Sequence, residues 1–181
     1  CRSQPGDLIS LLEQEFWVIG LSYQVLYPLI NNQGLVLEGR DLYSAWLGCS
    51  QTKDAEQTLE ALQEAGISHC HWLVVDHYGL DSTWGEEVLE KLSTSSSINP
   101  RLLAIDDLAD RPFKADLLLD QNFFGELSEE RYQGLIPKEC HQLLGPHYAL
   151  LGPEYAQLHP LVPIRKELRR VLVFFGGVDQ E

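Results

Sequence analysis

The sequence WLVVDHYGLDSTW, residues 72–84, decides the fold class of this chain. Its four leading apolar residues predict a strand that is buried on both faces, as strands in parallel sheets are. Asp76, His77 and Tyr78 follow the strand directly, and apolar residues at helical spacing then predict a helix over 80–92. A strand that passes straight into a helix predicts a βα unit.

The same arrangement recurs along the chain. Apolar runs predict further strands, and apolar residues three and four apart predict a helix over 50–66, with Gly66 at its C-terminal end. Strands that alternate with helices predict an α/β fold with a Rossmann-like, mostly parallel sheet. The other expected elements are strands at 16–21, 101–105, 117–119, 142–144 and 170–175 and short helices at 8–12 and 153–158.

Polar residues or glycines follow several of the predicted strands. In open α/β sheets, ligands bind beyond the carboxyl ends of the strands. We therefore expect these residues to lie along one edge of the sheet, where they form a predicted rim: Asp76, His77, Tyr78, Asp106, Asp107, Asp120, Asn122, Gly176 and Gly177.

Each rim residue also has a structural interpretation. Asp76 can cap the following helix while His77 and Tyr78 fill a loop. Alternatively, Tyr78 or His77 reaches a substrate as a proton carrier or hydrogen-bond partner. The residue pattern leaves both interpretations open. Asp106 and Asp107 could form a paired carboxylate, but we favour a structural role, because acids after strands are often caps.

The remaining rim residues are equally ambiguous. Asn122 can hold a ligand through its amide or stabilise a turn. Gly176 and Gly177 would let backbone N–H groups approach a phosphate. The chain contains no GxGxxG, GxxxxGK[ST] or GxSxG motif, so a dinucleotide fingerprint, a P-loop and a hydrolase nucleophile elbow are unsupported.

The composition of the chain limits the kinds of molecule that it is expected to bind. The chain has 181 residues and a formal net charge of -14, and this negative charge repels nucleic acids and anionic membranes. No apolar run approaches the roughly 20 residues that a membrane-spanning helix needs. The four scattered cysteines indicate a reducing, cytoplasmic environment. Residues 69–71, His-Cys-His, are interpreted as a loop before a strand rather than as metal ligands, and neither a metal nor a cofactor is expected.

Several segments together resemble one known family. They are WLVVDHYGLD, LLAIDDLADRP, ADLLLDQN, LLGPHYALLGPEY and RVLVFFGGVD, with CRSQPGDLISLL and DAEQTLEAL in support. In this order they are similar to the UDP-2,4-diacetamido-2,4,6-trideoxy-β-L-altropyranose hydrolases of pseudaminic acid biosynthesis. The likeness covers nearly the whole chain except about residues 22–44. One departure is Gly152, where the family usually has arginine.

The resemblance implies a fold and a reaction. That family is similar to two-domain GT-B glycosyltransferases, but it transfers the sugar to water with inversion and releases UDP, without a metal. Inversion requires a base that activates the water. The resemblance places this base, a histidine, before Cys1. It implies that Tyr78 bonds the attacking water or the sugar, with Asp76 and His77 beside it as further candidate catalytic residues. It also implies that Asn122 and Asp120 contact the sugar and that Gly176 and Gly177 approach the diphosphate.

The resemblance also predicts the domain organisation. Residues 1–160 would form the N-terminal Rossmann-like domain without its first strand-helix unit, and residues 161–181 would be a linker and the first strand of a UDP-binding domain. The expected partner is a UDP-sugar. The alternatives are a glycosyltransferase of the same fold, with a UDP-sugar donor, and a non-catalytic protein that binds sugar nucleotides.

Overall fold

The computed structural model of the chain describes residues 12–14, 16, 18–19, 21, 39–95, 98–127, 130–164 and 166–173. The chain divides into two compact units, Cys1–Ala149 and Leu150–Glu181. The predicted domain boundary after residue 160 stays a prediction.

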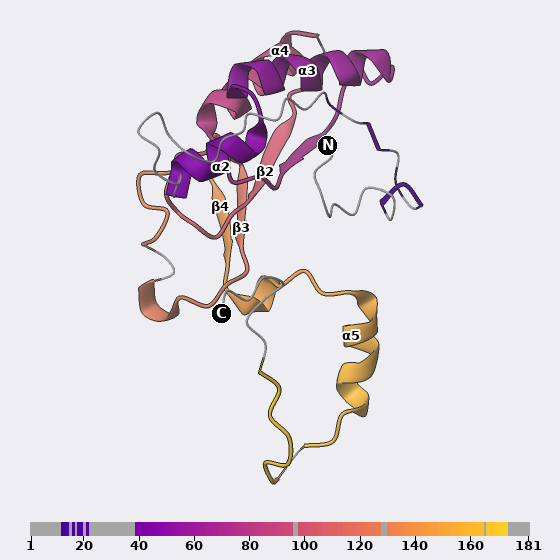
Figure 1. Cartoon of the computed structure of the whole chain (residues 1–181), viewed down its shortest axis with the longest axis vertical. Helices are drawn as coiled ribbons and strands as arrows, with labels where there is room; N and C mark the ends of the chain where they lie inside the picture. Colours follow the sequence, from indigo (N-terminus) through magenta and orange to yellow (C-terminus); the bar gives the residue numbers. More distant parts are fainter. Residues whose placement is uncertain are drawn as a thin grey trace. The chain divides into compact units, whose positions relative to one another are not determined.

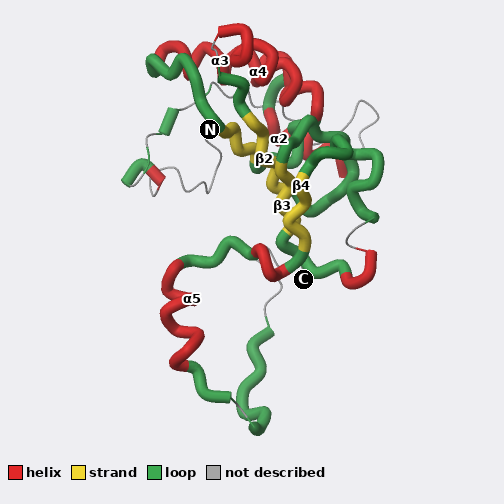
Figure 2. Tube along the Cα trace, turned by 180° about the vertical axis from the view of Figure 1, so that it is seen from behind, coloured by secondary structure: helices red, strands yellow, loops and turns green. Residues whose placement is uncertain are grey.

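A four-stranded parallel sheet is the centre of the first unit. Its strands are β1 (Trp72–Val75), β2 (Arg101–Ile105), β3 (Leu117–Asp120) and β4 (His141–Leu144). They lie in the order β1-β2-β3-β4, and all three neighbouring pairs are parallel. Figure 2 draws the strands in yellow and labels β2, β3 and β4. This topology confirms the predicted α/β class with a Rossmann-like sheet.

Helices precede and follow β1 along the chain. They are α2 (Gly39–Leu47), α3 (Gln51–Glu64) and α4 (Ser82–Ser95), and α3 and α4 pack side by side (Figure 1). The sequence predicts α3 correctly, because its ends carry local signals. The Ser50 side chain accepts a hydrogen bond from the Lys53 N–H at 3.2 Å, which caps the N-terminus. Gly66 has a φ of 72°, the left-handed conformation that favours glycine beyond a helix end.

Successive side chains of a strand point to opposite faces of the sheet, and one of these faces is covered by α4. Leu102 and Ala104 of β2 and Leu118 of β3 are buried against the apolar side of α4. A methyl group added at Gly85 of α4 would lie 3.3 Å from Leu102 Cδ1, so the helix is in close contact with β2. Val74 of β1, on the opposite face of the sheet, is 57% exposed.

The structure contradicts two predicted strands, those at 170–175 and 16–21, as far as it describes their residues. It also contains one helix, α2, that was not predicted. Residues 170–173 form no strand, and neither do residues 16, 18, 19 and 21. An apolar run becomes a strand only if a neighbouring strand satisfies its backbone, and no described segment pairs with these residues. The sequence did not predict α2. The helix predicted at 8–12 lies outside the described residues except for Leu12.

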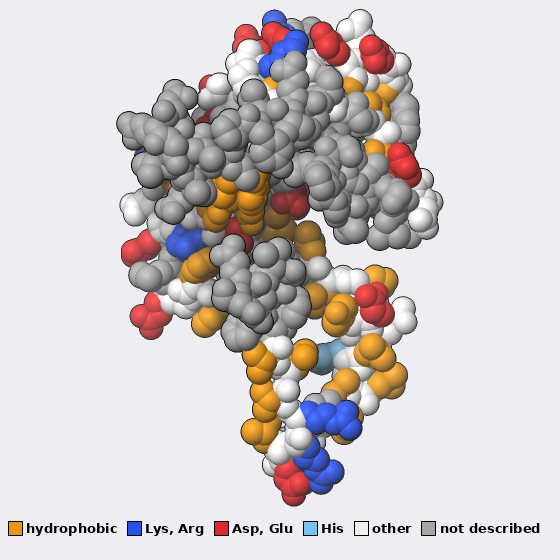
Figure 3. Space-filling model, in the orientation of Figure 1, with side chains coloured by type: hydrophobic (Ala, Val, Ile, Leu, Met, Phe, Trp, Pro, Cys, Tyr) orange, Lys and Arg blue, Asp and Glu red, His pale blue; other side chains and the backbone are white. Residues whose placement is uncertain are grey.

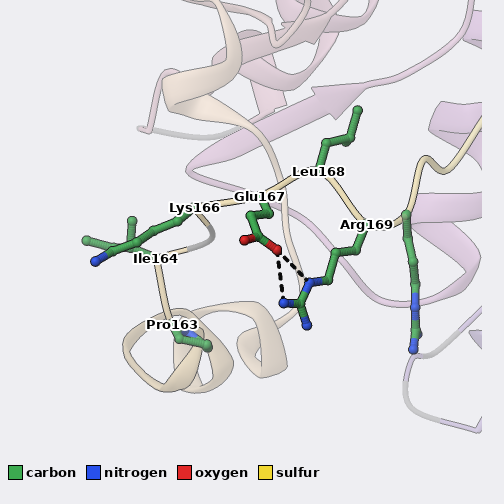
Figure 4. Close-up of a pocket in the computed structure, with 7 residues that line it drawn as sticks. Pro163, Ile164, Lys166, Glu167, Leu168 and Arg169 are labelled. Atoms are coloured by element: carbon green, nitrogen blue, oxygen red, sulfur yellow. Dashed lines mark hydrogen bonds and ion pairs between the residues drawn. The ribbon is translucent and has the colours of Figure 1, made fainter.

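The second unit contains α5 (Pro153–Leu158), as predicted, and a 3₁₀ turn, η3 (His159–Leu161). None of its described side chains is buried, and many apolar ones are exposed (Figure 3). A hollow lined by residues 163–164 and 166–170 is open to solvent, and an exposed ion pair between Arg169 and Glu167 forms part of its lining (Figure 4). Among the described residues, none of the helices has the length and apolar character that crossing a membrane requires.

Candidate functional site

The candidate site is formed by the loops that follow β1, β2 and β3. Because these strands are parallel neighbours, their carboxyl ends lie at one edge of the sheet. Tyr78 follows β1, Asp107 follows β2 and Asn122 follows β3. Gly176 and Gly177 lie outside the described residues, so their predicted approach to a diphosphate stays a prediction.

Tyr78 is partly buried between two elements of the first unit. Its ring centroid lies 5.1 Å from that of Tyr43 in α2, and the Arg111 guanidinium carbon lies 5.9 Å from the Tyr78 ring centroid. Burial raises the pKa of the Tyr78 phenol to about 12, and hydrogen bonding to Asp107 and the charges of Asp107, Asp106 and Asp76 act in the same direction. The phenol therefore keeps its proton at neutral pH.

Asp107 links Tyr78 to Asn122. The Asn122 side-chain amide donates a hydrogen bond to Oδ2 of Asp107 at 2.8 Å, and Arg131 donates one to the Asp107 carbonyl. Oδ1 of Asp107 is buried and has no partner at ordinary hydrogen-bond length among the described residues. The Asp107 carboxylate therefore has a free acceptor oxygen among the described residues, and its charge acts on the Tyr78 phenol. The structure brings Tyr78, Asp107 and Asn122 together at one place.

His77 shapes the loop that carries Tyr78. Its Nδ1 accepts a hydrogen bond from the Gly79 N–H at 2.9 Å, so a neutral imidazole carries its proton on Nε2. Gly79 is packed against α2, since a methyl group there would lie 2.6 Å from the Tyr43 carbonyl oxygen. These contacts fix the backbone on both sides of Tyr78.

The alternative role for Asp76 as a helix cap is wrong. The residue that caps α4 is Asp81, whose Oδ1 accepts a hydrogen bond from the Thr83 N–H at 2.9 Å. Asp76 is exposed, and its charge contributes to the raised pKa of Tyr78. Its position beside Tyr78 at the rim is therefore compatible with contact to a ligand.

Asp106 has a structural role, as the sequence favoured, but it caps no helix, because the loop after β2 leads to β3 without one. Its Oδ2 accepts a hydrogen bond from the Ala109 N–H at 2.9 Å, and its Oδ1 forms an ion pair with Arg111 at 2.8 Å. Arg111 also donates a hydrogen bond from Nε to the Leu80 carbonyl at 2.8 Å. The pair joins the loop after β2 to the loop after β1, on which Tyr78 lies.

Tyr132 and Asp120 form a second buried group beneath the site. The Tyr132 hydroxyl lies 3.0 Å from Oδ2 of Asp120 and 3.1 Å from Oδ2 of Asp106. Burial is the largest cause that raises the pKa of the Tyr132 phenol above its usual range, followed by the charges of Asp106 and Asp120. The phenol therefore stays protonated and can donate to only one of the two carboxylates at a time.

Asp120 is occupied within the protein. It is 2% exposed, its Oδ1 accepts a hydrogen bond from the Asn122 N–H at 3.1 Å, and Arg131 Nε lies 3.5 Å from its Oδ2. These contacts give Asp120 a supporting function for Asn122. Its predicted direct contact with the sugar stays a prediction.

The charge of the site favours a ligand that donates hydrogen bonds. Arg111 and Arg131, the arginines of this group, both have carboxylate partners. No group of three histidine, cysteine or acidic side chains within the described ranges is arranged to hold a metal ion. The loop interpretation of residues 69–71 is confirmed, because these residues precede β1 without regular structure.

Sequence reasoning missed part of this site. The sequence favoured a structural role for Asp107, whereas Asp107 lies between Tyr78 and Asn122 in the fold. Arg111 belongs to the segment LLAIDDLADRP, but a single arginine in a loop gives no sign of its buried partner. Tyr132 carried no signal, since its partners are 26 and 12 residues away in the sequence.

Comparisons with known proteins leave the family open. A scan of the chain against protein-family models gave no match, and neither did a search of curated proteins.

Proposed function

We propose that this chain belongs to a nucleotide-sugar hydrolase that releases UDP and free 2,4-diacetamido-2,4,6-trideoxy-L-altrose from the UDP-sugar in pseudaminic acid biosynthesis. The observation that supports it best is the convergence of Tyr78, Asp107 and Asn122 at the carboxyl ends of three parallel strands. The segments that resemble this hydrolase family carry all three residues.

The reaction is a single displacement. The oxygen of a water molecule forms a bond to the anomeric carbon, and the bond from that carbon to the diphosphate oxygen breaks with its electron pair on UDP. The proton of the water passes to a base, for which the resemblance implies a histidine. Tyr78, protonated at neutral pH, acts as a neutral hydrogen-bond partner of the water or the sugar and not as the base.

The charges near the site support separate binding places for the sugar and for the diphosphate of the substrate. Asp76 and Asp107 lie at the candidate site, and its arginines have carboxylate partners, so this edge suits the hydroxyl and amide groups of a neutral sugar. A diphosphate is better held by backbone N–H groups, as predicted for Gly176 and Gly177.

The test is release of UDP from the UDP-sugar by the complete protein. Replacement of Tyr78 by Phe should lower kcat by about 100-fold, because one hydrogen bond to the reacting groups is lost. Trp72→Phe is a matched control, since Trp72 lies at the other end of β1 and is 44% exposed. It should leave kcat unchanged.

Product analysis separates the alternatives. Free sugar together with UDP supports hydrolysis. A new disaccharide would replace the proposal with a glycosyltransferase, and binding of the UDP-sugar without UDP release would replace it with a binding protein. Full activity of Tyr78→Phe would remove the role assigned to this residue.

A further inference from the structure

Asp107 interacts with Tyr78 and Asn122, but the sequence did not predict that Asp107 itself contacts a ligand. Tyr78 comes from the loop after β1 and Asn122 from the loop after β3. Asp107 lies in the loop after β2, the strand between β1 and β3, and interacts with both side chains. A substitution at Asp107 would therefore disturb two ligand contacts at once.

The contacts of Asp107 determine which atoms its neighbours present. A Tyr78 hydroxyl that donates its proton to the carboxylate presents its oxygen lone pairs to a ligand. The Asn122 amide donates through Nδ2 to Asp107, which leaves the amide oxygen on the other side of the group. Both side chains then act as hydrogen-bond acceptors.

One carboxylate oxygen of Asp107 is available to accept a further hydrogen bond. Oδ1 of Asp107 is buried without an ordinary hydrogen-bond partner among the described residues, and an unsatisfied buried acceptor costs free energy. Hydrogen bonds of catalytic groups are often long without substrate and shorten when substrate binds. Closure of the Tyr78 hydroxyl onto Asp107 would satisfy this acceptor.

We propose that Asp107 is a positioning residue, which orients the Tyr78 hydroxyl and the Asn122 amide so that both accept hydrogen bonds from the sugar or the attacking water. The inference rests on the proposed function for the identity of the ligand. It adds a specificity rule, namely that this edge of the sheet recognises hydroxyl and N–H donors of the sugar.

The experiment measures the link between Asp107 and Tyr78 directly. The chain is labelled with 3-fluorotyrosine, whose more acidic phenol titrates in an accessible pH range, and Tyr78→Phe assigns the ¹⁹F signal. Asp107→Asn should lower the pKa of residue 78 by about one unit, because a negative charge and an acceptor are lost. Asp110→Asn, which removes an acid of the same loop whose partner is Arg111, should leave it unchanged.

Kinetics of UDP release test the consequence for the sugar. Asp107→Asn should lower kcat about tenfold or more with a smaller change in KM, and Asp107→Glu should keep the raised pKa of residue 78 and recover part of kcat. Asn122→Ala, which retains the Asp107 charge, should lower kcat while the pKa of residue 78 stays raised. It provides the test if Asp107→Asn does not fold.

The two proposals fail in different ways. A ¹⁹F titration that is the same in Asp107→Asn and the unsubstituted chain would overturn the positioning role, whatever the activity. An unsubstituted protein that releases no UDP would overturn the proposed function, whereas the titration would still report on the contact. Unchanged kcat in both Asp107→Asn and Asn122→Ala would overturn the positioning role as well.

Discussion

Arg111 and Asp106 form an ion pair of 2.8 Å in which the two side chains are 2% and 0% exposed. The pair joins the loop after β2 to the loop that carries Tyr78, because Arg111 also donates a hydrogen bond to the Leu80 carbonyl. Breaking a buried ion pair on one side leaves a charge without a partner in a region of low dielectric constant. The integrity of the candidate site thus depends on a residue beneath it.

Replacement of Arg111 by Met should strongly destabilise the fold. The Asp106 carboxylate would stay buried without its cation, and we expect the free energy of unfolding to fall by about 3–5 kcal/mol. Unfolding in urea, followed by circular dichroism, measures this change. Lys53→Met is the control, because the pair between Lys53 and Glu56 is half exposed on both sides. Equal stability of the two variants would contradict the assigned role of Arg111.

The cap of α4 predicts a stability that depends on pH. Burial of Asp81 opposes ionisation, but hydrogen bonds with Gln51, Thr83 and Arg40 outweigh it and lower the pKa of this carboxyl below its ordinary value. A lowered pKa in the folded state means that the charge stabilises the fold above about pH 4. This contribution is lost as pH falls through the lowered pKa.

Two variants of Asp81 separate the cap from the charge. Asp81→Ala should lower the free energy of unfolding at pH 7 by about 1 kcal/mol, because the Thr83 N–H loses its acceptor. Asp81→Asn keeps a capping oxygen and should lose less. The difference between the original chain and Asp81→Asn should shrink below pH 4 in urea titrations. A difference that stays constant from pH 7 to pH 3 would show that the charge does not contribute.

The sequence predicts the sheet better than its surroundings. Apolar runs at 72–75 and 101–105 identify buried strands because each run carries its own signal. The helix α2 begins at Gly39, a poor helix former, and so lacks such a signal. The run at 170–173 has the composition of a strand but no described partner with which to pair.

Local sequence patterns likewise predicted only part of the candidate site. Tyr78 and Asn122 follow strands, so topology alone brings them to one edge. Asp107 also follows a strand, but an acid at such a position is so often a cap that its link to both residues is visible only in three dimensions. Arg111 and Tyr132 find their partners across the fold, which no local pattern records.

A hydrogen bond between α3 and α4 provides a third prediction. Trp84 donates a hydrogen bond from Nε1 to Oδ1 of Asp54 at 2.8 Å, and both residues are 5% exposed. Trp84→Phe keeps an aromatic ring but removes the donor, so the free energy of unfolding should fall by about 1–3 kcal/mol. A double-mutant cycle with Asp54→Ala should give a coupling energy of at least about 0.5 kcal/mol. Strictly additive effects would rule out the direct bond.

Gly79 offers a test of the packing that fixes Tyr78. A methyl group at this position would lie 2.6 Å from the Tyr43 carbonyl oxygen, which belongs to the backbone of α2 and cannot rotate away. Gly79→Ala should therefore push the Tyr78 loop from α2 and cost about 1–3 kcal/mol of unfolding free energy. Thermal unfolding and the ¹⁹F signal of residue 78 report the two effects.

Gly152→Ala is the matched control for this substitution. Its methyl group would meet the carboxylate of Glu154, the far end of an exposed and flexible side chain, and Gly152 has an ordinary φ of -60°. The stability should hence change little, and the signal of residue 78 should stay where it is. If Gly79→Ala were as stable as Gly152→Ala and left the ¹⁹F signal in place, contact with α2 would not be what holds Tyr78.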